Sequence, residues 1–140
     1  MTNTTRTLKS ILDYVSEAKQ ERTVVKRLQE KECFELKTIL QGNFNEKINF
    51  PFPPGPPPFD RSEKELEITE EKLLVLGKLT KFYKSRQLQI EKEMAFIHLL
   101  ESVSAKDADI IVAMKDGELE SLYPKITRSV VTKAFPNLKI

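Results

Sequence analysis

The chain has 140 residues, of which 39% are hydrophobic and 31% are charged, a balance that is typical of a folded globular domain and excludes a disordered chain. Its formal charge of +2 indicates no class of partner, and its one cysteine, Cys33, excludes an internal disulfide and a cysteine-cluster metal site. No stretch reaches the roughly 18 apolar residues of a membrane span, and the first five residues lack the apolar run of a signal peptide. We therefore expect one cytosolic domain over residues 1–140, with no membrane contact and no cofactor.

Residues 5–43 have the periodicity of two or three short helices. The first apolar stripe follows the i, i+3, i+4, i+7 spacing of a helix, in Leu8, Ile11, Leu12 and Val15. Thr5 or Thr7 supplies its N-cap. Further helical patterns follow, and the last ends near Gly42. Helices this short are marginal in isolation, so we expect them to pack against the rest of the chain.

The proline run, residues 50–59, holds six of the eight prolines and three phenylalanines. It cannot be helical, because each proline lacks an N–H donor and has a fixed φ, so we expect polyproline II broken at Gly55. Three interpretations are open: an exposed ligand for aromatic grooves, a spacer between two lobes, or an ordered strap over residues 44–59. The strap is favoured because an exposed linker has no physical reason to carry phenylalanines that are each worth roughly 1.5 to 3 kcal/mol when buried. The residues that we expect to act in a protein interaction or in the strap are Phe50, Phe52, Pro54, Pro57 and Phe59.

The remainder of the chain predicts four further helices. The first begins within or just after the acidic residues 60–71 and includes Leu66 and Ile68. The longest covers residues 87–103, with a broad apolar face that includes Leu88, Met94, Ile97 and Leu100.

Two shorter helices complete the predicted set. One follows an N-cap at Ser104 and ends at residues 116–117, and the other follows an N-cap at Thr127 and ends before Pro136. With no strong strand pattern and no repeat, the predicted fold class is all-α.

The prediction for the whole chain is six or seven short helices in one compact domain. An N-terminal helical lobe covers residues 5–43 and a C-terminal helical lobe covers residues 63–138. The strap at residues 44–59, ordered and extended, joins the two lobes.

Three landmarks occur in order over residues 8–138. They are LQGNFN at residues 40–45, leading into the proline run; FIHLLESV at residues 96–103, followed by Asp107 and by MKD at 114–116; and YPKIT at 123–127, with AFPNL at 134–138. In this order they resemble a functionally uncharacterised family of small proteins from large tailed (contractile-tailed, T4-like) bacteriophages. The chain departs from that family at residues 53–55, where the family more often has a Leu-Pro-Glu-Gly-like segment, and matches it loosely over residues 62–85. The resemblance implies a viral protein in the cytoplasm of an infected bacterium or in the virion, and it supplies no catalytic residue.

The sequence predicts no catalytic and no metal site. His98 lies in an apolar helical run, and no serine or cysteine motif accompanies it as a nucleophile. Five acidic residues cluster without the spacing of an EF-hand loop, and we interpret them as a solvated face plus a turn: Asp107, Asp109, Asp116, Glu118 and Glu120.

The favoured function is that of a non-enzymatic bacteriophage accessory protein that acts through protein–protein contacts, as a virion or assembly component or as a modulator of a host or phage machine. Its partner would be a phage or host protein, or a second copy of the chain. The alternative is a small nucleic-acid-binding protein that uses two basic segments, residues 78–86 and 125–139. The residues that would contact nucleic acid are Lys78, Lys81, Tyr83, Lys84, Arg86, Lys125, Arg128 and Lys133.

Overall fold

The computed structural model describes residues 5–80 and 88–140, and in these ranges the chain forms eight helices. They are α1 (Leu8–Ser16), α2 (Glu21–Glu30), α3 (Phe34–Phe44), α4 (Glu70–Lys78), α5 (Gln89–Glu101), α6 (Ala105–Lys115), α7 (Leu119–Leu122) and α8 (Arg128–Ala134). Extended pairing within these ranges is limited to one isolated bridge between Ser62 and Ser104. The all-α prediction is therefore confirmed. The helix that the sequence did not predict is α7, a single turn in what we expected to be a short apolar connection.

Three threonines cap helices by accepting a backbone N–H in the first turn. Thr7 accepts from Ser10 N at 3.0 Å in a reciprocal capping box, and Thr127 accepts from Val130 N at 3.2 Å, so both of these predicted caps are confirmed. Thr69 accepts from Lys72 N at 3.3 Å, which starts α4 later than expected and leaves Leu66 and Ile68 outside the helix.

Ser104 stands at the N-cap position of α6, but its hydroxyl does not cap that helix. Its Oγ accepts from Leu66 N at 2.6 Å and donates to Leu66 O at 3.1 Å. The prediction that the Ser104 hydroxyl caps α6 is thus wrong, because Leu66, in a loop distant in the sequence, offers this hydroxyl both a donor and an acceptor.

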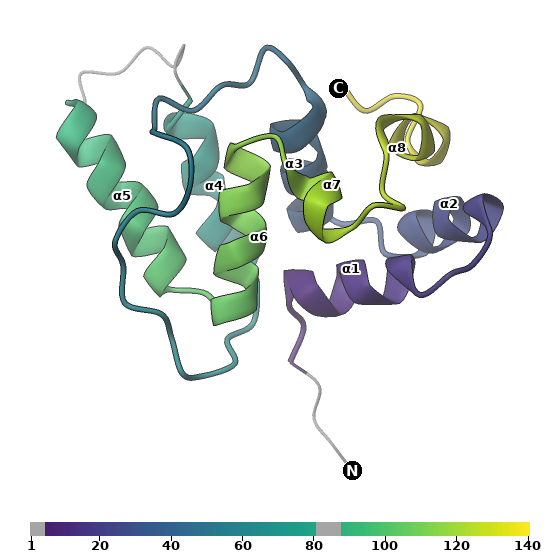
Figure 1. Ribbon diagram of the computed structural model, residues 1–140, viewed down its shortest axis with the longest axis horizontal. Coiled ribbons are helices and arrows are strands. Elements are labelled where there is room, and N and C mark those ends of the chain that lie inside the picture. The colour runs from purple at the N-terminus through teal and green to yellow at the C-terminus, as the bar shows by residue number, and fades with distance from the viewer. Residues whose placement is uncertain (1–4, 81–87) are drawn as a thin grey trace.

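α6 is the central helix, in contact with α1, α3, α5 and α7. Its buried residues face more than one side, as expected for a helix surrounded by others. All eight helices contribute side chains to one hydrophobic core. In Figure 1, α4 and α5 lie at one end of the molecule and α2 and α8 at the other. The proposed division into two lobes at residues 44–59 stays a prediction.

The connection from α3 to α4, residues 45–69, is the longest in the described part of the chain and contains the proline run. Figure 1 shows it running past α5 and α6 before it reaches α4. Hydrogen bonds join it to those two helices and to the residue that follows α6. Among them, Gln89 Nε2 donates to Pro51 O, Lys115 Nζ donates to Pro53 O, Asp60 N donates to Glu101 and Gly55 N donates to Asp116.

Candidate functional site

α5 is an edge helix that leaves large apolar side chains in solvent. Ile90 and Met94 are 61% and 57% exposed, and Ile97 is half-buried. The i, i+4, i+7 spacing places these three residues, here called the α5 stripe, on one face of the helix. Leu88, at the N-cap, is also exposed, so Leu88 and Met94 of the predicted broad apolar face lie in solvent, whereas Leu100 of the same face is buried. The core side of α5 consists of Phe96, Leu99 and Leu100.

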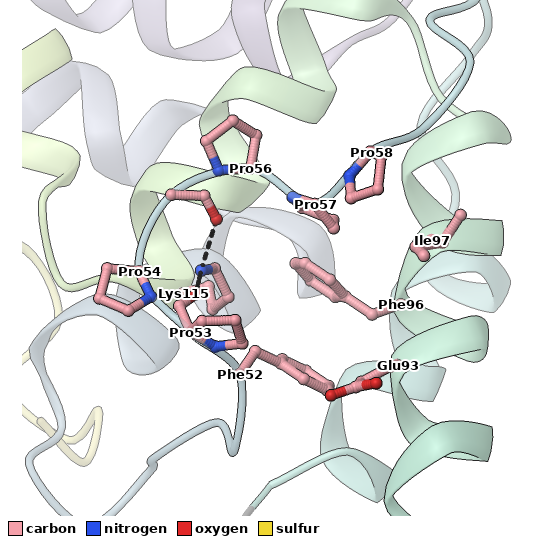
Figure 2. A pocket seen from close by; sticks show the side chains of 11 residues that line it. Phe52, Pro53, Pro54, Pro56, Pro57, Pro58, Glu93, Phe96, Ile97 and Lys115 are labelled. Atoms are coloured by element: carbon pink, nitrogen blue, oxygen red, sulfur yellow. Dashed lines mark hydrogen bonds between the residues drawn. The ribbon is translucent and has the colours of Figure 1, made fainter.

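A hollow of about 370 Å³ lies beside the α5 stripe, between α5 and the proline run. Its lining is mainly apolar: Phe52, Pro53, Pro54, Gly55, Pro56, Pro57, Pro58, Glu93, Phe96, Ile97 and Lys115. The rings of Phe52 and Phe96 stack with their centroids 4.9 Å apart and their planes 20° from parallel. Figure 2 shows the proline run curving around the ring of Phe96, which extends from α5. Because Ile97 belongs both to the stripe and to the hollow, the two form one continuous apolar surface, here called the α5 face.

The path of the proline run is fixed by hydrogen bonds to its backbone. Lys115 Nζ donates to Pro53 O at 2.7 Å and to Gly55 O at 2.9 Å, and it forms an ion pair with Asp116 at 2.7 Å. Asp116 in turn accepts from Gly55 N at 2.9 Å. Gly55 has a φ of 83°, a conformation that favours glycine. Lys115, whose side chain is 1% exposed, is therefore fully occupied inside the structure.

Acidic side chains border the α5 face. At 100° of rotation per residue, Glu91 and Glu93 lie on opposite sides of the stripe, and Glu101 continues its line one turn beyond Ile97. Among the described residues, none of these three carboxylates forms an ion pair. The lysine of α5, Lys92, is buried on the side away from Met94. The described part of this surface is thus apolar at its centre and negatively charged at its edges.

The five predicted strap residues occupy different positions. Phe50, Phe52 and Phe59 are half-buried and pack against the core, and Pro54 and Pro57 line the hollow beside Phe52. Phe50 lines a second hollow, of about 270 Å³, between α3 and α4. The ring of Phe59 lies under the guanidinium of Arg61, whose Cζ is 5.7 Å from the ring centroid.

The basic residues proposed for nucleic-acid contact do not gather on one surface in the described part of the chain. Lys78 ends α4, whereas Lys125, Arg128 and Lys133 belong to the end of the molecule that carries α8 (Figure 1). Lys81, Tyr83, Lys84 and Arg86 lie outside the described residues.

The three bases at the α8 end already have partners within the chain. Lys125 Nζ donates to Ser16 O, at the end of α1, and to Ala18 O, two residues later, at 3.0 and 2.8 Å. Arg128 donates to Phe44 O at the end of α3, and Lys133 pairs with Glu21 at 2.7 Å. These contacts favour a structural role for the second basic segment.

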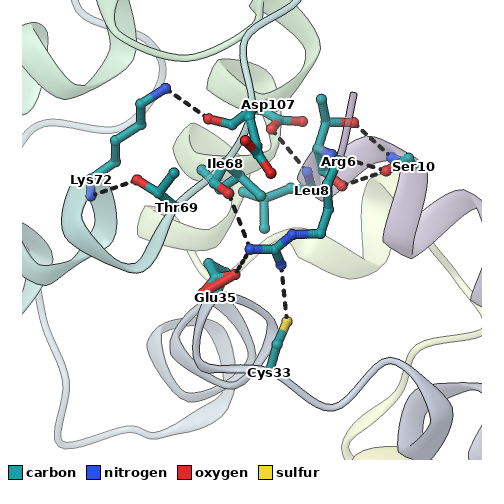
Figure 3. A network of polar contacts seen from close by, with 11 residues as sticks. Arg6, Leu8, Ser10, Cys33, Glu35, Ile68, Thr69, Lys72 and Asp107 are labelled. Carbon is teal, nitrogen blue, oxygen red and sulfur yellow. Dashed lines mark hydrogen bonds and ion pairs between the residues drawn. The ribbon is translucent and has the colours of Figure 1, made fainter. Parts of the chain in front are cut away.

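A buried polar cluster, here called the α1 junction, lies where α1, α3, α6 and the segment before α4 meet (Figure 3). Asp107 is 0% exposed, and its two carboxylate oxygens accept from Leu8 N and Lys9 N, each at 2.9 Å. Asp107 therefore binds the N-terminus of α1, and the prediction of a solvated face is wrong for it. Burial raises the pKa of this carboxyl, and the two N–H groups only partly offset the increase.

Arg6 completes the α1 junction. Its Nη2 donates to Ile68 O at 3.2 Å and lies 2.5 Å from Glu35 Oε2, and Ile68 N donates to Arg6 O at 2.8 Å. Arg6 Nη1 also approaches Cys33 Sγ at 3.7 Å. Glu35 is nearly fully buried, so this ion pair balances a charge that has little access to water.

Within residues 5–80 and 88–140, no group of three or more His, Cys, Asp or Glu side chains is arranged to hold a metal ion. His98 is exposed on α5 and lines a shallow depression with Lys72 and Ser102.

A model of one protein family matches residues 11–121, from α1 into α7. It is described as a family of unknown function (DUF6433). No curated protein and no solved structure matches the chain. Across the described ranges, no helix combines the length and the apolar character needed to span a membrane. The matched residues include the whole of the α5 face.

Proposed function

Since the chain belongs to the family of unknown function DUF6433, we propose its function from its own surface: it is a non-enzymatic protein that acts by binding another protein through the α5 face. The observation that carries this proposal is the exposure of Ile90 and Met94 next to an apolar hollow. Contiguous apolar surface of this kind, with a polar border, marks sites of association. Covering one such side chain contributes up to roughly 1.5 to 3 kcal/mol.

Residues 44–59 act in this proposal as an ordered strap that forms one wall of the binding site. Phe52 stacks on Phe96, and Lys115 and Asp116 bind the backbone at Pro53 and Gly55. A wall fixed before binding loses less conformational entropy when a partner arrives. The proline run is thus treated as part of the site, and neither as a spacer nor as a ligand for another domain.

We place this activity in a bacterium infected by a tailed phage, on the strength of the sequence landmarks at residues 40–45, 96–103 and 123–127. The partner is then a phage or host protein, met in the host cytoplasm or in the virion. Two roles fit such a partner: a component of particle assembly, or a modulator of a host or phage machine.

Site-specific photo-crosslinking tests the proposal. A benzophenone amino acid replaces Met94 in one variant and the exposed Ser129 of α8 in a control, and each variant is produced in infected cells and irradiated. We expect a discrete protein adduct at position 94 and none at position 129. Absence of an adduct at 94, or equal adducts at both positions, would contradict the proposal. Mass spectrometry of purified virions then separates the assembly role from the modulator role.

A further inference from the structure

We propose that the partner contributes a basic amphipathic α-helix that lies along α5, with one apolar side chain in the hollow and with Lys or Arg beside the acidic border. This inference rests on the proposed function and specifies the chemistry of the segment that the α5 face binds. It follows from three properties of that face: its hydrogen-bonding groups, its charge and its length.

Among the described residues, the hydrogen-bonding groups around the hollow leave no donor for an extended ligand. Lys115 donates to Pro53 O and Gly55 O, and the side-chain amide of Gln89 donates to Pro51 O and to Glu93. A polyproline II ligand has carbonyls that need donors, and in the described ranges no strand offers a sheet edge for an added strand. A helix satisfies its own backbone, so it loses no hydrogen bonds on this surface.

The charge of the α5 face selects a cationic helix. Glu91, Glu93 and Glu101 belong to the border, while Lys115 is enclosed and Lys92 is buried. Glu93 already accepts from Gln89 and Glu101 from Asp60 N, but among the described residues none of the three carboxylates is paired with a cation, so the partner must supply the positive charge. Lys and Arg meet that requirement, and their long apolar stems also cover the surface around Met94.

The same charges argue against a second copy of the chain as the occupant. An α5-to-α5 contact would bring Glu91 and Glu93 of one chain close to those of the other. Like charges placed close together oppose association. We therefore assign the face to a different protein, and treat self-association as an outcome that contradicts the inference.

The length of the stripe matches two turns of a helix. Ile90 and Ile97 are seven residues apart, which corresponds to roughly 10.5 Å along the axis. A partner helix with apolar residues at i, i+3 or i+4, and i+7 presents anchors over the same distance. One of these anchors enters the hollow against Phe52 and Phe96, where a binding hot spot is expected because it is the most enclosed part of the face.

Selection from a display library of 16-residue helical peptides tests the inference. All members carry apolar residues at i, i+4 and i+7, and the flanking positions vary among Lys, Arg, Glu and Ser; a second library contains proline-rich peptides. We expect the wild type to enrich Lys and Arg over Glu at the flanks by at least tenfold, with no enrichment from the proline-rich library. Met94→Glu should abolish the enrichment.

Two further variants control for general effects. Leu74→Glu changes a similarly exposed apolar residue, 52% exposed and on α4, and should select the same peptides as the wild type. The double variant Glu91→Lys, Glu93→Lys should reverse the preference to Glu at the flanks. Circular dichroism checks that every variant is folded.

Several results would overturn the inference: no enrichment, flanks without a charge preference, selection of proline-rich peptides, or a dimer in sedimentation that Met94→Glu dissociates. These results differ from failure of the proposed function. If crosslinking at position 94 captures a protein but the helix library fails, the proposed function stands and the helix inference falls. If crosslinking also fails, both fall.

Discussion

The α1 junction buries charged side chains, whereas the α5 face exposes apolar ones. At the junction, Asp107 and Glu35 are withdrawn from water, and each is matched by N–H groups or by a guanidinium. At the α5 face, Ile90 and Met94 remain exposed to water in the described part of the chain. Burial of a charged group costs free energy unless it is paired, and exposure of an apolar group forgoes its stabilisation. The comparison indicates that the junction contributes to the fold, and the exposure of the face supports the proposed binding role.

The largest effect on stability is expected for a substitution at the α1 junction. Asp107→Ala leaves Leu8 N and Lys9 N without their acceptor, and an unsatisfied buried donor costs roughly 1 to 3 kcal/mol. We expect a loss of about 2 to 4 kcal/mol in the free energy of unfolding, measured by urea denaturation. Asp109→Ala, which removes a surface pair with Arg61 from the same helix, should cost about 1 kcal/mol or less. Equal losses of stability in the two variants would contradict the role of Asp107 as the acceptor that holds the N-terminus of α1.

The second largest effect on stability is expected for a substitution in the proline run. Phe52→Ala removes the stack on Phe96 and opens one side of the hollow. Because Phe52 is half-buried, we expect a loss of about 1 to 2 kcal/mol and a fall in melting temperature of several degrees. Calorimetry measures the fall in melting temperature, and Leu122→Ala, a substitution at an exposed residue, is the control. An unchanged melting temperature would restore the interpretation of residues 44–59 as a linker.

A smaller effect is the pH dependence of the α1 junction. Burial raises the pKa of Asp107, so the folded chain binds this proton more readily than the unfolded chain does. Its contribution to stability is therefore fully present below the unfolded pKa of about 3.9 and is lost as the pH rises through the native pKa. We expect the free energy of unfolding of the wild type, minus that of Asp107→Asn, to fall as the pH rises from acid to neutral. Denaturation at a series of pH values measures this difference, and a rise with pH would contradict the stated direction.

The smallest effect on stability is expected at the α5 face. Met94→Glu replaces an exposed side chain, so the free energy of unfolding should change by no more than about 0.5 kcal/mol. The same variant should lose the enrichment of helical peptides that the wild type shows, which makes it the reverse of Asp107→Ala. A large loss of stability would mean that Met94 packs within the fold, and the contrast between the two regions would fail.

The sequence predicts those features of the fold that depend only on residues close together in the chain. The caps at Thr7 and Thr127 and the apolar stripe of α1 are local patterns, and the structure confirms them. Leu66 and Ile68 were assigned to a helix because apolar spacing alone does not distinguish the end of a loop from the first turn of α4.

The candidate site depends on contacts between distant residues. α5 has apolar residues on both its core side and its outer side, so periodicity could not tell which side would remain exposed at Met94. Asp107 reaches Leu8 across 99 positions, and Lys115 reaches Pro53 across 62. No local spacing signals such a pairing, and only the packed chain brings these groups together.

The bonds from Lys115 and Asp116 to the proline run have a consequence for how relatives can diverge. They involve the carbonyls of Pro53 and Gly55 and the N–H of Gly55, and no side chain of the run. Substitutions at the neighbouring prolines can therefore alter the wall of the hollow while the chain keeps its path, provided that positions 55, 115 and 116 retain a glycine, a long cation and a carboxylate. Under the proposed function, drift in a few surface residues can in this way exchange one partner for another while the helical scaffold stays unchanged.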